Sequence, residues 1–252
     1  MDLEGYIAVF DSGVGGISVL KEITKLLPNE NYVFYGDSLH APYGEKSVEE
    51  VRRLTFNALD PLVKRGVKAI VVACNTATSI AIDYLRDQYS IPVIGVEPAL
   101  KPAVMDRKKN ILVMATANTL RLEKFSQLEK TYGEDVNVIP LACNGLAARI
   151  EKGRLDDQDL YDLLEELLSP YKGKIDGVVL GCTHYPLIKK QIAKVLGDVS
   201  FYDGGKGTAR ELKRRLEACH KLSGSTDKGN LIFLSSKNEE EEIALYRWFY
   251  SL

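Results

Sequence analysis

The sequence has little of what marks membrane, secreted or nucleic-acid-binding proteins. Its first five residues carry no basic leader, and the apolar run that follows them is only long enough for a strand. Lys and Arg are scattered, with no basic stripe that contains interleaved aromatic residues. A net charge of −2 and a charged fraction of 27% are ordinary for a soluble protein. We therefore expect a cytoplasmic protein that engages neither membranes nor nucleic acid.

The four cysteines, Cys74, Cys143, Cys182 and Cys219, are too few and too widely spaced for a disulfide framework. A structural zinc site is not indicated either, because Cys182 and His184 are only two positions apart and Cys74 stands alone. In a reducing compartment an isolated cysteine is either a buried apolar residue or a working thiol. The first interpretation suits Cys143 and Cys219, whereas the surroundings of Cys74 and Cys182 favour the second.

Short apolar runs rich in β-branched residues alternate with longer amphipathic stretches along the whole chain. This alternation predicts βαβ units, and hence an α/β fold whose mostly parallel sheets are flanked by helices on both faces. Helices are expected at 16–27, 48–65, 157–171 and 207–221. Strands are expected at 7–10, 32–35, 69–73, 93–96, 111–115, 136–141, 177–180, 200–202 and 231–234.

The length of 252 residues, 45% of them hydrophobic, can support one large or two small cores. No low-complexity linker divides the chain, but two cues favour a two-lobed plan. A proline-punctuated segment at 91–102 could carry the chain between lobes, and an apolar strand ending in cysteine occurs once in each half. We place the first lobe at residues 1–95 plus 209–252 and the second at residues 96–208.

The two cysteine segments, residues 69–78 and 177–186, share one layout. Each has a buried strand, then a thiol, then hydrogen-bonding side chains and a predicted helix; Cys74 is followed by Asn-Thr and Cys182 by Thr-His. Ligands of open α/β sheets bind outside the carboxyl ends of the strands, which is where both cysteines are expected. A helix N-terminus beside each sulfur would favour the thiolate.

Two such thiols suit few kinds of chemistry. A cysteine nucleophile with a histidine base needs only one thiol, which would leave Cys74 idle. Two thiols on opposite sides of one ligand could instead remove a proton from one face and supply one to the other. Inversion of an α-carbon requires that pair of roles, so the residues favour racemisation.

The opening segment, residues 7–18, is a strand, a glycine loop and a helix, and it admits two interpretations. Its glycines partly fit the dinucleotide-binding pattern, with Ser18 where the third glycine belongs, and Asp37 resembles the ribose-binding acid. Against this, Asp11 would place a carboxylate beside the incoming pyrophosphate. The same Asp11 suits a substrate ammonium or a role beside a thiol, with the loop amides binding a small carboxylate.

Three further segments are weaker candidates on their own. Tyr43 and the Gly44 amide could hold a carboxylate, or they could form a turn with an exposed tyrosine. Thr116 and Thr119 leave a strand for a helix, where one of them is an adequate N-cap. Glu151 reads as a solvated residue at the end of a helix.

Together these segments resemble the glutamate racemases of the aspartate/glutamate racemase superfamily. The resemblance spans nearly the whole chain and is carried by Asp11-Ser12-Gly13-Val14-Gly15-Gly16, by Gly36-Asp37 with Ala41-Pro42-Tyr43-Gly44, by Ala73-Cys74-Asn75-Thr76-Ala77 and by Gly181-Cys182-Thr183-His184-Tyr185-Pro186. It implies two similar lobes with the active site between them, no pyridoxal phosphate and no metal. It also implies interconversion of L- and D-glutamate, with D-glutamate supplied for peptidoglycan.

The resemblance also implies roles for individual residues. The catalytic group comprises Cys74, Cys182, Asp11 and His184, the last two assisting the thiols. The supporting acids are Asp37 and Glu151. The substrate contacts are Asp11, Ser12, Tyr43, Gly44, Asn75, Thr76, Thr116, Thr119, Thr183 and His184. The chain departs from the usual family pattern at 95–100, 115–119 and 142–146, and the last two departures leave the substrate range open.

Several alternatives remain at this point. Within the superfamily, an aspartate racemase or a hydantoin- or malonate-type enzyme would use similar thiols. A dinucleotide-binding protein would use the glycine loop, and a binding-only protein would retain the ligand without turnover. The C-terminal segment 243–250 is apolar enough for an interface, so a homodimer is a possible assembly, although a helix packed on its own lobe also fits.

Overall fold

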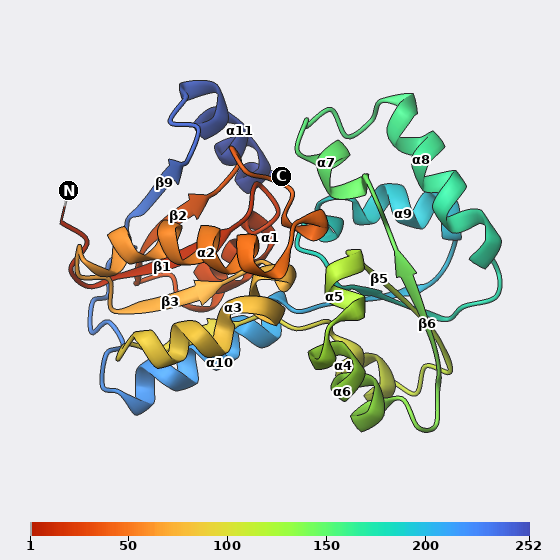
Figure 1. Cartoon of the computed structure of the whole chain (residues 1–252), viewed down its shortest axis with the longest axis horizontal. Coiled ribbons are helices and arrows are strands. Elements are labelled where there is room, and N and C mark those ends of the chain that lie inside the picture. The colour runs from red at the N-terminus through yellow and green to blue at the C-terminus, as the bar shows by residue number, and fades with distance from the viewer. Residues whose placement is uncertain (1) are drawn as a thin grey trace. The chain divides into compact units, whose positions relative to one another are not determined.

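The structure, a computed structural model, describes residues 2–252, which divide into two compact units (Figure 1). The first unit contains the chain up to Val96 together with Gly205–Leu252, and the second contains Glu97–Gly204. The chain therefore returns from the second unit to the first just before helix α10 (Gly205–Ala218). The sequence analysis placed this return after residue 208, which lies inside that helix. No helix in the described part of the chain is long and apolar enough to cross a membrane.

The first unit is built on a five-stranded sheet in the order β4-β3-β1-β2-β9, with every neighbouring pair parallel. Its strands are β1 (Tyr6–Asp11), β2 (Asn31–Gly36), β3 (Ala69–Val72), β4 (Val93–Gly95) and β9 (Leu231–Ser235). Its helices are α1 (Ile17–Leu26), the 3-10 helix η1 (Tyr43–Glu45), α2 (Val48–Val63), α3 (Asn75–Gln88), α10 and α11 (Glu240–Ser251).

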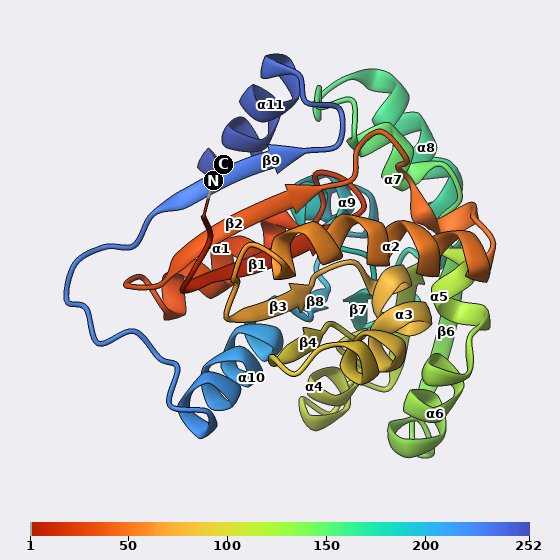
Figure 2. The same ribbon diagram turned by 60° about the vertical axis from the view of Figure 1, so that its left-hand side comes forward.

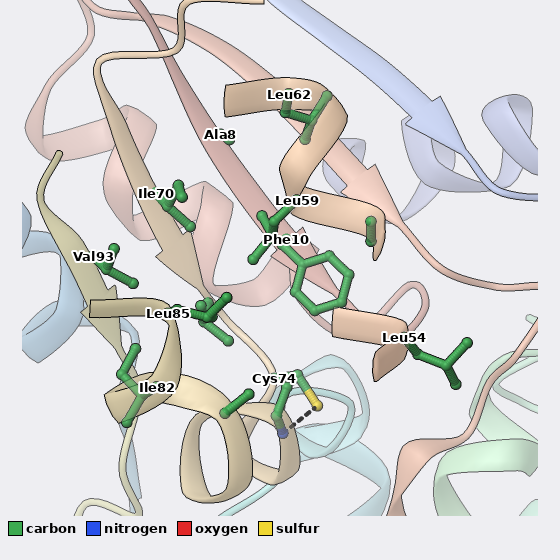
Figure 3. Close-up of a cluster of buried hydrophobic side chains, with 14 of the residues drawn as sticks. Ala8, Phe10, Leu54, Leu59, Leu62, Ile70, Cys74, Ile82, Leu85 and Val93 are labelled. Atoms are coloured by element: carbon green, nitrogen blue, oxygen red, sulfur yellow. Dashed lines mark hydrogen bonds between the residues drawn. The ribbon is translucent and has the colours of Figure 1, made fainter. Parts of the chain in front are cut away.

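Helices cover both faces of this sheet, as its uninterrupted apolar strands require. On one face, Ala8 and Phe10 of β1 pack against Leu59 of α2 and Leu85 of α3 (Figure 3). Side chains alternate along a strand, so Val9 is buried on the opposite face. There α1 packs against α10 and α11. Figure 2 shows these two helices near opposite edges of the sheet, α11 beside β9 and α10 near β4.

The second unit has a four-stranded parallel sheet in the order β6-β5-β7-β8. Its strands are β5 (Asn110–Ala115), β6 (Asn137–Ala142), β7 (Gly177–Leu180) and β8 (Ser200–Asp203). Its helices are α4 (Leu100–Met105), α5 (Ala117–Arg121), α6 (Glu123–Tyr132), α7 (Leu146–Ile150), α8 (Gln158–Leu168), α9 (Lys189–Leu196) and the 3-10 helices η2 (Ser169–Tyr171) and η3 (Tyr185–Ile188). Side chains of α4 and α6 form one core with β5 and β7.

The predicted α/β class and parallel sheets are confirmed. Each of the nine expected strands is present in the described chain, with ends that agree to within one residue. Helix ends are less accurate. The helix expected at 157–171 is α-helical only to Leu168 and continues as η2, because Pro170 lacks the N–H that an α-helical turn would use.

Candidate active-site residues in each unit

Both thiols lie at the topological switch point of their own sheet. In the first unit the chain passes from β1 to β2 on one side and then to β3 on the other, so the switch falls between β1 and β3. In the second unit the same argument places it between β5 and β7. Cys74 follows β3, and Cys182 follows β7. In open α/β sheets, the crevice that binds the ligand lies at such a point, beyond the carboxyl ends of the strands.

The Cys74 sulfur caps helix α3. It accepts a hydrogen bond from the Ala77 amide at 3.4 Å, drawn as a dashed line in Figure 3, and lies 3.5 Å from the Ser12 hydroxyl. The side chain is buried. The free amides and positive dipole end of a helix stabilise negative charge on sulfur. The start of α3 therefore places a group that stabilises negative charge beside the Cys74 sulfur.

Asp11 ends β1 and is fully buried. Its Oδ1 accepts the Gly13 amide at 3.0 Å, so the first turn of the glycine loop folds around the carboxylate. A Cβ at Gly16 would lie 2.5 Å from the Asp11 Cβ, which explains a glycine there by close packing. This loop therefore encloses a carboxylate at the point where a dinucleotide site would need to admit a pyrophosphate.

Tyr43 is buried, so the interpretation as an exposed turn tyrosine is wrong. Its hydroxyl donates to Asp37 Oδ2 at 2.5 Å, and His40 Nδ1 lies 2.8 Å from the other oxygen, Oδ1. Burial and the Asp37 carboxylate raise the pKa of Tyr43, so the phenol keeps its proton and gives it to Asp37. A nearby backbone donor is the Gly44 amide, which lies in the first turn of η1, where an N–H has no partner within the helix.

Asn75 and Thr76 follow Cys74 in the first turn of α3, and both are buried. The Asn75 Oδ1 accepts no hydrogen bond from the described residues. Buried polar atoms almost always have a partner, and an unpartnered acceptor beside a thiol is typical of a ligand contact. This oxygen, next to Cys74, is therefore a candidate acceptor for a donor group of a ligand.

In the second unit, Cys182, His184 and Glu151 form a relay. The Cys182 sulfur lies 3.5 Å from His184 Nδ1, and His184 Nε2 lies 2.5 Å from Glu151 Oε1. Burial lowers the pKa of His184, but Cys182 and Glu151 outweigh that effect and raise it well above its ordinary value. The imidazole is therefore suited to hold a proton between a thiolate and a carboxylate.

Two details of this relay differ from the sequence interpretation. Glu151 is not a solvated helix end, since its side chain is 15% exposed and bound to His184. No α-helix begins directly after Cys182: Tyr185 starts the 3-10 helix η3, and α9 begins at Lys189. Pro186 occupies the first turn of η3. His184 and Glu151 are therefore the groups beside Cys182 that can stabilise negative charge on its sulfur, as the start of α3 can at Cys74.

The threonines of the second unit lie at the same carboxyl edge. Thr116 caps α5 by accepting the Thr119 amide at 3.2 Å, and the two hydroxyls are 3.0 Å apart. Thr183 is buried beside Cys182. The predicted side chains of this unit are thus gathered at the ends of β5 and β7.

Tyr185 was missed by the sequence interpretation; Cys143 is buried, as predicted, whereas Cys219 is exposed and the same prediction for it is wrong. The Tyr185 hydroxyl donates to the Cys143 carbonyl at 3.4 Å, and burial together with Cys182 and Cys143 raises the pKa of Tyr185. Burial also raises the pKa of the Cys143 thiol to about 12, so this thiol stays protonated. Tyr185 lies in the motif quoted above, but only the fold brings it to Cys143.

The side chains that could bind a metal ion are not clustered in the part of either unit that the structure describes. Over residues 2–252, no group of three or more His, Cys, Asp or Glu side chains is arranged to hold a metal ion. The side chains that gather at the two sheet edges are thiols, hydroxyls, amides and carboxylates. Such a set can transfer protons and bind a small polar ligand.

Comparison with known proteins agrees with this chemistry. The model of the Asp/Glu/Hydantoin racemase family matches residues 7–212. The chain is 54% identical over 244 residues to a glutamate racemase of Clostridium kluyveri, covering 95% of each chain. It is similar to glutamate racemase RacE1 of Bacillus anthracis, with a TM-score of 0.87, 32% identity and coverage of 99% and 95%. It is also similar to the Francisella tularensis glutamate racemase in complex with D-glutamate, with a TM-score of 0.85, 29% identity and coverage of 100% and 95%.

Proposed function

Because the chain belongs to the glutamate racemases of the Asp/Glu/Hydantoin racemase family, we propose that Cys74 and Cys182 are the two acid/bases that interconvert L- and D-glutamate. The observation that carries this assignment is the equivalent placement of the two thiols, each at the switch point of its own sheet. Each sulfur also has its own stabilising group, the start of α3 for Cys74 and His184 for Cys182.

The reaction transfers one proton at each face of the α-carbon. One cysteine, as thiolate, takes the α-proton and leaves a carbanion whose charge spreads into the α-carboxylate. The other cysteine, as thiol, gives a proton to the opposite face and becomes the thiolate. Exchange with solvent then resets the pair. Glu151 holds His184 in place, and the proton affinity of His184 rises when Cys182 is a thiolate and falls when it is a thiol.

Substrate binding falls to side chains and backbone amides that the fold holds in place. We assign the ammonium to Asn75 Oδ1 and the Asp11 carboxylate, and one carboxylate to the Gly44 amide and the Ser12 hydroxyl. The remaining contacts are Tyr43, Thr76, Thr116, Thr119, Thr183 and His184. Among these contacts, the threonine hydroxyls are fixed donors that stabilise the charge that builds on the α-carboxylate as the proton leaves.

Hydrogen isotope entry tests the two-thiol assignment. In D₂O, D-glutamate formed early from L-glutamate should carry deuterium at Cα, because the incoming proton comes from a thiol equilibrated with solvent. Unreacted L-glutamate should remain protiated, and proton NMR at low conversion measures both. Protium retained in the product, or deuterium washing into unreacted substrate, would indicate one shared base. Cys74→Ser and Cys182→Ser should each lose nearly all turnover, whereas Cys143→Ser should retain it.

We further propose that the enzyme works in the cytoplasm, where it supplies D-glutamate for peptidoglycan without a nucleic-acid partner, either alone or as a homodimer. Complementation of a bacterium that grows only with added D-glutamate tests the metabolic role. Sedimentation of the purified chain tests the homodimer. Failure to support growth, despite racemase activity in vitro, would remove the metabolic assignment and leave the chemistry in place.

A further inference from the structure

The phenol of Tyr246, in the C-terminal helix α11, reaches the sheet edge that carries the candidate site of the first unit. Tyr246 is fully buried, and its ring packs edge-on against Phe34 of β2, with centroids 5.2 Å apart. The hydroxyl therefore lies at the carboxyl ends of β2 and β9. Asp11, at the end of β1, is the strand neighbour of Gly36, so this hydroxyl is one strand away from Asp11.

The Tyr246 hydroxyl joins three groups there. It lies 2.7 Å from the Ser38 hydroxyl, and it can donate to the Gly36 carbonyl or to the Ser235 hydroxyl, each at 3.2 Å. Ser38 is buried and directly follows Asp37, whose carboxylate receives the Tyr43 hydroxyl. The contact thus links α11 to the segment 37–44, which contains the proposed substrate contacts Tyr43 and Gly44.

The contact of the Tyr246 hydroxyl requires a glycine at position 36. A Cβ at Gly36 would lie 2.2 Å from the Tyr246 hydroxyl oxygen and 2.7 Å from its ring carbon Cζ. Only glycine admits the phenol at this distance. The sheet edge is therefore shaped to receive the hydroxyl as well as the ring.

The start of this segment is also held by contacts that do not involve Tyr246, among them the bonds of Tyr43 and His40 to the Asp37 carboxylate. The Asp37 amide donates to the Asp11 carbonyl at 2.9 Å, and the Leu39 amide donates to the Ser236 hydroxyl at 2.9 Å. Leu39 itself is 61% exposed and adds little packing. Those contacts are made by Asp37 and Leu39, whereas the buried hydroxyl of Ser38 is bonded by Tyr246.

We propose that Tyr246 is a positioning residue for substrate binding, which acts through Ser38 on the segment 37–44. The proposal rests on the assignment of Tyr43 and Gly44 as substrate contacts under the proposed function. These contacts hold the substrate and the transition state alike, so loosening them should raise KM and leave kcat nearly unchanged.

Tyr246→Phe tests this in the full-length enzyme, because it removes one oxygen and keeps the ring against Phe34. The matched control is Tyr32→Phe in the same unit. Tyr32 is equally buried, and its hydroxyl donates to the Leu27 carbonyl at 2.7 Å, at the other end of β2. Both variants lose one buried hydroxyl, but only Tyr246 touches the segment 37–44.

The expected result is a KM for glutamate that rises about two- to tenfold in Tyr246→Phe, the effect of one hydrogen bond, with kcat within about twofold of wild type. Tyr32→Phe should keep the wild-type KM. Equal KM changes in the two variants would overturn the proposal, because they would reflect general loosening; an unchanged KM in Tyr246→Phe would overturn it as well. If Tyr246→Phe does not fold, Ser38→Ala breaks the same contact from the other side.

Amide hydrogen exchange of the substrate-free enzyme gives a second readout. Segment 37–44 should exchange faster in Tyr246→Phe than in wild type, and it should be unchanged in Tyr32→Phe. This measurement does not depend on glutamate. A wild-type chain without racemase activity would refute the proposed function, and the exchange rates would still decide whether Tyr246 positions the segment.

Discussion

Glu151→Gln is a demanding test of the relay at Cys182. The substitution keeps the size of the side chain and an oxygen that can face His184 Nε2, but it removes the negative charge 2.5 Å from that nitrogen. His184 is buried, and Glu151 is one of the groups that keep its pKa high. The variant therefore lowers the proton affinity of His184 while the Cys182–His184 contact remains.

The expected size follows from the hydrogen bond that is weakened. Hydrogen bonds to charged groups contribute about 1.5–3 kcal/mol, and each ~1.4 kcal/mol corresponds to a factor of ten in rate. The Glu151 side chain is 15% exposed, so solvent screens only a little of the interaction. We expect kcat/KM to fall by about 10- to 150-fold.

The assay compares the two directions of racemisation. L- and D-glutamate are equally stable, so kcat/KM must fall by the same factor in both directions. The deuterium isotope effect from α-deuterated substrate should become unequal. It should be larger in the direction in which Cys182 removes the deuteron, because that step has become the slow one. The same comparison assigns each thiol to its enantiomer.

Asp159→Asn is the matched control, because it removes a carboxylate that binds Arg149, two residues before Glu151, at 2.7 Å. It should change kcat/KM by less than about twofold. If Glu151→Gln behaves like this control, or if its isotope effects stay equal in the two directions, the relay does not assist Cys182.

Three further results are expected. Burial lowers the pKa of His184, but Cys182 and Glu151 raise it above 6.5 overall, so its contribution to stability is complete below about pH 6.5 and is lost as the pH rises through the folded pKa. Urea unfolding at a series of pH values above about 6.5 should therefore show a larger loss of stability with rising pH in wild type than in His184→Asn; equal losses would contradict the raised pKa. Cys143→Ala should retain racemisation, and a loss of turnover would give this third thiol a role. Burial raises the pKa of Cys143 to about 12, so iodoacetamide at about pH 8 should modify the exposed Cys219 much faster, as mass spectrometry of the peptides would report.

The sequence was a good guide wherever the determining interaction is local. Apolar, β-branched runs broken by Gly, Pro and polar residues predicted the strands, because a parallel strand covered on both faces needs that pattern over only four to six residues. The positions of Cys74 and Cys182 were predicted for the same reason: a polar residue directly after such a strand must lie at the carboxyl edge of the sheet. The Thr116 cap followed from the same kind of local rule.

Only the tertiary structure decided which distant side chains form hydrogen bonds around these two sites. Glu151 looked solvated from its neighbours in sequence, and it meets His184 only because the end of α7 folds against the turn after β7, 33 positions along the chain. The hydroxyl of Tyr43 could point to solvent, to substrate or to Asp37, and burial of that loop selects Asp37. Tyr246 lies 208 positions from Ser38, and no periodicity in the sequence connects them. Hydrophobic patterning specifies that an element forms and which face it buries, whereas a hydrogen bond between distant loops depends on the direction of single side chains after the cores have packed.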